Sequence, residues 1–122
     1  MDVVRGDLGN VDQLAELVGG CDAVVHLAAV ADSSSAKLNQ QVNVEGSRNL
    51  VEACRRQGVK RIINVSSTCA GRKLQDEYGK TKRLAEDEFK GDDLDVTHLR
   101  PTMIYGHGSK EFDIFASVVG RL

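Results

Sequence analysis

Two kinds of hydrophobic pattern alternate along the chain, and each kind predicts a different element. Short, nearly continuous apolar runs are typical of strands buried in a parallel sheet. Three such runs lie in the interior of the sequence, and a shorter one lies near its start. The predicted strands cover residues 3–5, 23–27, 61–65 and 95–99.

Between these runs, apolar residues recur every three or four positions, which is the spacing of a helix with one buried face. Asn10 is placed to cap the first helix, and Gly19-Gly20 is placed to end it. A small, polar stretch over 28–37 is expected to be a loop. The predicted helices cover residues 11–18, 38–57, 78–90 and 112–122.

Strand and helix alternate throughout the sequence, which is typical of βαβ units with parallel strands. The length of 122 residues is that of one domain. The expected fold is therefore α/β: a single domain over 1–122 with a partial Rossmann-type parallel sheet of about four strands and helices. In such sheets, ligands gather at the carboxyl ends of the strands.

Charge and composition narrow the choice of partners. The formal net charge of −2 argues against nucleic acid or a membrane surface as the main partner. No apolar run approaches the roughly 20 residues of a membrane span. The three cysteines have no metal-ligand spacing, as expected of reduced thiols in a cytoplasmic protein. The three histidines also lack such partners, so we expect them to be structural or solvated.

One stretch carries candidate chemistry. Tyr78 and Lys82 lie four residues apart, so on a helix they share one stripe one turn apart. A nearby ammonium favours the phenolate and lowers a tyrosine pKa, which suits the tyrosine for exchanging protons with a substrate oxygen. Hydroxyl groups at Ser66-Ser67-Thr68 precede this helix and would converge on the same sheet edge.

A second interpretation of the same helix needs no chemistry. Tyr78, Ala85 and Phe89 could form its buried face, with Lys82 extending its aliphatic chain along the rim of the core. Both interpretations remain open at the level of residue spacing alone.

In these motifs the chain resembles the extended short-chain dehydrogenase/reductase family, the NAD-dependent epimerases and dehydratases, over almost its whole length. Tyr78 and Lys82 match the catalytic Tyr-x-x-x-Lys of that family. The resemblance implies that Tyr78 is the general acid/base and that Lys82 lowers its pKa while binding the nicotinamide ribose. By register Thr68 takes the position that orients the substrate oxygen, with Ser67 as the alternative.

Further motifs in the family's order imply a binding site for NAD or NADP. They are the strand end at 5–8, the segments at 25–29 and 43–50, and the segment at 99–106. The implied cofactor-binding residues are Asp7, Leu8, Leu27, Ala28, Ala29, Asn43, Ser66, Tyr78, Lys82, Pro101 and Ile104. Family members are oxidoreductases and isomerases whose substrates are most often nucleotide-linked sugars.

The sequence departs from the family pattern at both ends and in the middle. The family's Gly-x-x-Gly-x-x-Gly turn, which brings the backbone close to the pyrophosphate, does not occur in these residues. The connection from Thr68 to Tyr78 is also shorter than in most epimerases. We therefore expect a truncated middle portion of such an enzyme, without the Gly-rich βαβ unit and the substrate domain.

This truncation has a structural consequence. Right-handed crossovers would place most helices on one face of the sheet and leave an apolar face bare. The strand at 3–5 would pair with 23–27, remain unpaired, or pair with another chain. We therefore expect a homo-oligomer. The alternative function is a catalytically inert relative that serves as a nucleotide-binding or oligomerisation module.

Overall fold

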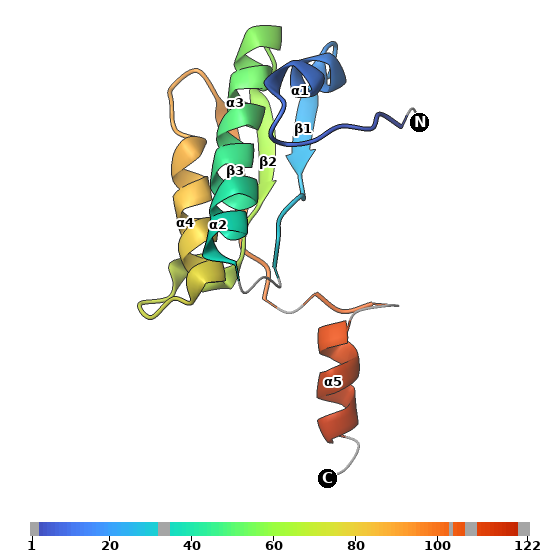
Figure 1. Ribbon diagram of the computed structural model, residues 1–122, viewed down its shortest axis with the longest axis vertical. Helices are drawn as coiled ribbons and strands as arrows, with labels where there is room; N and C mark the ends of the chain where they lie inside the picture. The colour runs from blue at the N-terminus through green and yellow to red at the C-terminus, as the bar shows by residue number, and fades with distance from the viewer. Residues whose placement is uncertain (1–2, 32–34, 103, 107–109, 120–122) are drawn as a thin grey trace.

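The computed structural model describes residues 3–31, 35–102, 104–106 and 110–119 (Figure 1). The helices and strands alternate as the sequence predicts. In chain order they are α1 (Val11–Val18), β1 (Ala23–His26), α2 (Ala36–Asn39), the π-helical turn η1 (Gln40–Glu45), α3 (Gly46–Gln57), β2 (Arg61–Val65), the 3₁₀ turn η2 (Thr68–Gly71), α4 (Glu77–Glu88), β3 (Asp95–Leu99) and α5 (Lys110–Val119).

The described strands form one parallel sheet in the order β1-β2-β3. Their register aligns Val24, Ile62 and Val96 across the sheet. Two positions further along, it aligns His26, Asn64 and His98. Helices α1, α3 and α4 lie on one face of this sheet (Figure 1). The α/β class and the Rossmann-like architecture are therefore confirmed.

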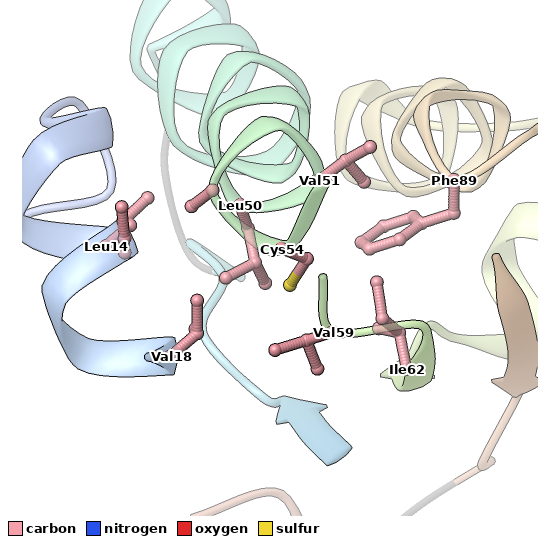
Figure 2. Close-up of a cluster of buried hydrophobic side chains, with 10 residues drawn as sticks. Leu14, Val18, Leu50, Val51, Cys54, Val59, Ile62 and Phe89 are labelled. Carbon is pink, nitrogen blue, oxygen red and sulfur yellow. The ribbon is translucent and has the colours of Figure 1, made fainter. Parts of the chain in front are cut away.

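The hydrophobic core lies between the sheet and these helices (Figure 2). Ile62 and Cys54 are completely buried at its centre, and Phe89 closes it beneath the end of α4. The other side chains of the cluster come mainly from the inner faces of α1 and α3. They are Leu14, Ala15, Val18, Leu50, Val51, Ala53 and Val59.

The opposite face of the sheet is exposed. Along β1 and just beyond it, Val25 is 55% exposed and Leu27 is 70% exposed. Leu99 on β3 is 48% exposed. The interpretation of 23–27 as a strand buried on both faces is therefore wrong, because the helices packed on the sheet cover one side of it.

Local capping explains where most helices begin and end. The Asn10 side chain accepts hydrogen bonds from the backbone N–H groups of Asp12 and Gln13, each at 3.1 Å, at the start of α1. Gly58 ends α3 with φ of 72°, a left-handed conformation that favours glycine. The predicted helix over 38–57 is present, but it begins at Ala36 and is interrupted by η1.

Two further predicted elements differ from the structure. Residues 3–5 do not form a strand, since none of the described strands pairs with them and β1 remains at the edge of the sheet. The last helix is Lys110–Val119 where 112–122 was predicted, and residues 120–122 lie outside the described part of the chain. In Figure 1 α5 stands away from the sheet and its helices.

Because the core lies on one face of the sheet, substitution of two neighbouring isoleucines of β2 should destabilise the protein to different extents. Ile62 is completely buried under the helices, whereas Ile63 points to the opposite face and is partly exposed. We expect Ile62→Ala to lower the free energy of unfolding by about 2–5 kcal/mol. The matched variant Ile63→Ala should cost clearly less. Urea unfolding of both variants measures this, and equal costs would contradict a core on one face only.

Candidate active site

The candidate site forms where the chain leaves β2 and β3. The backbone N–H of Ser66 donates to the carbonyl oxygen of Leu99 at 2.7 Å, and that of Thr68 donates to Pro101 at 3.1 Å. The Ser67 side chain accepts a hydrogen bond from the N–H of Cys69 at 3.2 Å and so caps η2. The hydroxyl-bearing segment after β2 is therefore fixed against the segment after β3.

Helix α4 begins next to this junction. The Asp76 carboxylate caps it by accepting a hydrogen bond from the N–H of Gly79 at 2.7 Å. A β-carbon at Gly79 would lie only 2.9 Å from the carbonyl oxygen of Cys69, so this close approach requires glycine. The contact sets the first turn of α4, with Tyr78, directly against η2.

This arrangement brings Tyr78 to Ser67. Burial of the phenol is the largest influence on the pKa of Tyr78 and raises it, whereas a hydrogen bond with the Ser67 side chain acts in the opposite direction. Tyr78 is therefore protonated at neutral pH. Thr68, which the family resemblance favours as the hydroxyl partner of Tyr78, is the first residue of η2. Its backbone N–H donates a hydrogen bond to the carbonyl oxygen of Pro101.

Lys82 lies one turn further along α4 and is 3% exposed. Its ammonium donates to the carbonyl oxygen of Val65 at 2.9 Å, at the carboxyl end of β2. Burial lowers the pKa of Lys82, and the negative charge of Glu86 partly opposes this effect. The expectation that Lys82 lowers the pKa of Tyr78 does not hold here: that pKa is raised, and the ammonium is directed to Val65.

Asn43 connects the site to the segment after β1. Its side-chain oxygen accepts from the N–H of Val30 at 2.8 Å, and its amide donates to the carbonyl oxygen of Val30 and to the Thr81 hydroxyl, both at 3.1 Å. Asn43 is 2% exposed and lies in the π-helical turn η1. π-Helical turns are frequent at functional sites. The Asn43 side chain therefore connects α4 to the segment that follows β1.

Four of the other residues expected to bind the cofactor line two cavities. Asp7 and Leu8 line a cavity of about 530 Å³ between the 6–9 loop and the helix that contains η1. Leu27 and Ala28 line a cavity of about 350 Å³ beside β1, which Leu8 also borders. Leu8 therefore lies between the two cavities.

The remaining predicted cofactor residues differ in accessibility. Ala29 and Ile104 are exposed, and Pro101 is partly buried beside Thr68. Ser66 is 4% exposed, so its side chain belongs to the interior and not to an open surface. The predicted set is therefore spread along the carboxyl edge of the sheet and does not form one continuous cavity.

A layer of buried polar side chains beneath α4 was not predicted as functional. His26 is 5% exposed, and its Nε2 atom lies 3.2 Å from the Ser47 hydroxyl, which itself donates to the carbonyl oxygen of Asn43 at 2.7 Å. Glu86 is 3% exposed and paired with Arg100. The available signal in the sequence was a polar residue within an apolar pattern, as at Ser47 on the buried stripe of α3.

Two further properties concern only the described part of the chain. No group of three or more histidine, cysteine or acidic side chains is placed there to hold a metal ion. No helix in those same residues is long and apolar enough to cross a membrane.

The burial of His26 predicts a specific loss of stability in acid. Burial, aided by the positive charge of Lys82, lowers the pKa of His26 from 6.5 to about 4. As the pH falls from about 6.5 to 4, the unfolded chain binds a proton that the folded chain does not. The free energy of unfolding should therefore drop by about 3 kcal/mol over this window through His26 alone.

The variant His26→Gln should remove this part of the pH dependence. Urea unfolding of both proteins at pH 7, 5.5 and 4 measures the difference in slope. The Glu86–Arg100 pair does not interfere, because the pKa of Glu86 is held at about 2 and its contribution is lost mainly below pH 4.5. Parallel pH profiles for the two proteins would show that His26 is not the responsible group.

Comparison with known proteins places this arrangement in a family. A family model described as NAD(P)H-binding matches residues 1–116. Ceramide reductase of Caulobacter vibrioides is 34% identical over 111 residues, which cover 91% of this chain and 35% of that protein. N-acetyl-alpha-D-glucosaminyl-diphospho-ditrans,octacis-undecaprenol 4-epimerase of Escherichia coli O157:H7 is 33% identical over 125 residues, covering 86% of this chain and 38% of the epimerase.

Solved structures agree with this assignment. The structure of MoeE5 in complex with UDP-glucuronic acid and NAD matches with a TM-score of 0.78 and 30% identity, over 97% of this chain and 46% of MoeE5. The chain thus spans between about a third and a half of the length of these relatives. It belongs to the NAD(P)H-binding family, within the group of short-chain dehydrogenases/reductases and epimerases/dehydratases that its motifs resemble.

Proposed function

We propose that this chain carries the proton-transfer part of an NAD(P)-dependent epimerase, dehydratase or reductase. The observation that carries the proposal is the close packing of the first turn of α4 on η2, which sets Tyr78 beside Ser67, with the buried ammonium of Lys82 one helical turn away. All three groups lie at the carboxyl edge of the sheet, where ligands of α/β folds bind.

Each group has a role that follows from its surroundings. Tyr78 is protonated at neutral pH, so it can give its proton to a substrate carbonyl oxygen in the reductive direction, and its phenolate form can take a proton from the substrate hydroxyl in the oxidative direction. The Ser67 hydroxyl is within reach of the same oxygen and would hold it beside the phenol. Lys82 supplies positive charge next to the end of β2 and favours negative charge developing nearby.

The residues present fit the nicotinamide end of the cofactor better than its phosphates. Tyr78, Lys82 and Pro101 lie where the ends of β2 and β3 meet. Gly6 and Gly9 border the cavity beside Asp7, but the spacing Gly-x-x-Gly-x-x-Gly does not occur in the 122 residues. A bound nicotinamide would accept or donate the hydride. We therefore expect weak cofactor binding by these residues alone.

For the substrate we propose a nucleotide-linked sugar whose hydroxyl or carbonyl group reacts. Support comes from MoeE5, whose structure is a complex with UDP-glucuronic acid and NAD. The name of the E. coli epimerase also describes an amino sugar on a diphosphate, there joined to undecaprenol. The ceramide reductase match supports a lipid alcohol or ketone as the second candidate.

We also propose that two copies of the chain associate through the bare face of the sheet. Val25, Leu27 and Leu99 form an exposed apolar patch on this face. Such a patch marks an interaction surface, and a two-fold dimer covers it with an identical patch. The same surface supports the alternative function as an inert oligomerisation module.

Cofactor titration distinguishes a catalytic from an inert chain. We expect weak but saturable binding of NADH or NADPH, followed by nicotinamide fluorescence, and a dissociation constant below roughly 100 µM would exclude the inert module. With UDP-glucose and NAD as reactants, Tyr78→Phe should retain binding and lower turnover by roughly 10²–10⁴-fold. The absence of binding even at roughly 1 mM cofactor would exclude independent catalysis and favour the inert module.

Matched variants then assign the hydroxyl and the cation. Ser67→Ala should lower turnover more than Thr68→Val, because Ser67 is the residue bonded to Tyr78. Lys82→Met should abolish turnover, whereas Lys80→Met, on the exposed side of the same helix and paired with Glu77, should not. A larger loss in Thr68→Val would return the hydroxyl role to Thr68.

Light scattering tests the association of two copies. We expect a dimer at roughly 10 µM, because exposed apolar patches of this kind are unfavourable in water. The variant Val25→Glu should dissociate it by placing a charge on the bare face. The control Leu84→Glu changes a similarly exposed residue on α4, 46% against 55%, and should remain dimeric. A monomeric wild-type chain would contradict the proposal.

A further inference from the structure

Tyr78, Lys82 and Glu86 follow one another at intervals of four residues along α4. They therefore lie near one stripe of the helix, each one turn after the last. Glu86 is the third member of this series and is 3% exposed. A carboxylate at such a depth is costly unless it is paired and hydrogen-bonded, so its partners indicate what it does.

The principal partner of Glu86 is Arg100. The guanidinium donates from Nε to Oε1 at 2.8 Å and from Nη2 to Oε2 at 2.6 Å, which is a two-point pair. Arg83 adds a longer contact of 3.3 Å from the preceding turn of α4. Since Arg100 directly follows β3, the pair joins the helix that carries Tyr78 to the end of a different element.

Arg100 also touches the hydroxyl-bearing segment. A β-carbon at Gly71 would lie 3.3 Å from Nη1 of Arg100, so the guanidinium packs against the end of η2. The neighbouring Pro101 accepts the hydrogen bond from the N–H of Thr68. The position of Arg100 is therefore coupled both to α4 and to the segment that presents Ser67.

We propose that Glu86 is a positioning residue of the site: paired with Arg100, it fixes α4 against the ends of β2 and β3. It is also the buried counter-ion of Lys82, one turn further along the same stripe and not in direct contact with it. Its mechanistic meaning rests on the proposed function, but its effect on Lys82 does not depend on a cofactor. The Tyr78–Ser67 contact would then depend on an ion pair that touches neither residue.

Several charged groups surround Glu86 and act on its pKa. Arg100 lies on the β3 side and Arg83 on α4, His98 of β3 contributes a weaker positive influence, and Asp87 is the nearest acid along the helix. Burial acts to raise the pKa of Glu86, but Arg100, through its hydrogen bonds and its charge, and His98 to a smaller extent hold it at about 2. The carboxylate therefore stays charged, and its charge opposes the effect of burial on Lys82.

The same helix offers a matched control. Glu88 makes a comparable two-point pair with Arg48 of α3, at 2.8 and 3.0 Å. That pair also joins α4 to another element, but it lies nearer the surface, where Arg48 is 60% exposed. Glu86→Gln and Glu88→Gln thus remove one carboxylate charge each from similar pairs at different places.

The experiment measures the proton affinity of the Lys82 ammonium in the full chain by a pH titration of its side-chain NMR signals. In Glu86→Gln we expect the affinity to fall roughly tenfold, because the compensating charge is gone while burial remains. In Glu88→Gln it should not change. A purely structural ion pair predicts equal, small effects in both variants, and that result would overturn the proposal.

A second variant covers the case in which Glu86→Gln fails to fold. Arg100→Gln leaves the carboxylate in place and removes the exposed cation, so the proton affinity of Lys82 should rise instead of fall. An unchanged or lowered affinity would also overturn the proposal. Neither measurement needs cofactor or turnover. If NADH does not bind while the Lys82 shifts appear, the proposed function fails and the role of Glu86 as counter-ion remains.

Discussion

The structure depends on how α4 meets the carboxyl ends of β2 and β3. An α-helix that packs on a sheet normally buries an apolar stripe. This one also buries Thr81, Lys82 and Glu86. Each of these groups needs a partner at that depth, and each finds it in another segment: Asn43, the carbonyl of Val65, and Arg100 respectively. The polar contacts therefore fix the helix at one position, where apolar packing alone would allow it to slide.

Much of this could be predicted from the sequence, because the determining signals are local. The strands at 61–65 and 95–99 and the helix after Asn10 follow from periodicity and capping. The absence of the predicted strand at 3–5 could not, since a strand exists only where another one pairs with it. The sequence also predicted the roles of the site residues only in part. Spacing places Tyr78 beside a hydroxyl, but the choice between Ser67 and Thr68 depends on how η2 turns the chain.

The electrostatics show the same limit more clearly. Residue spacing on a helix indicates that Lys82 can reach Tyr78, whereas the direction of its ammonium depends on a carbonyl that lies 17 residues earlier in the chain. Likewise, neither Glu86 nor Arg100 is conspicuous in the sequence, and 14 residues separate them. Buried charges are organised by tertiary contacts, so their pKa directions follow from the fold and not from the motif.

The π-helical turn at Gln40–Glu45 has a consequence for how this chain tolerates changes in length. A π-turn accommodates about one residue more than an α-turn, so it shifts every later side chain by roughly 100° around the helix axis. Asn43 lies within the turn, and the buried stripe of α3 begins immediately after it. Loss of a single residue from this turn would restore a regular helix, but it would rotate either Asn43 or the apolar stripe of α3 away from its partners. A substitution in this turn therefore changes one side chain, whereas a deletion rotates all the side chains on one side of it relative to their partners.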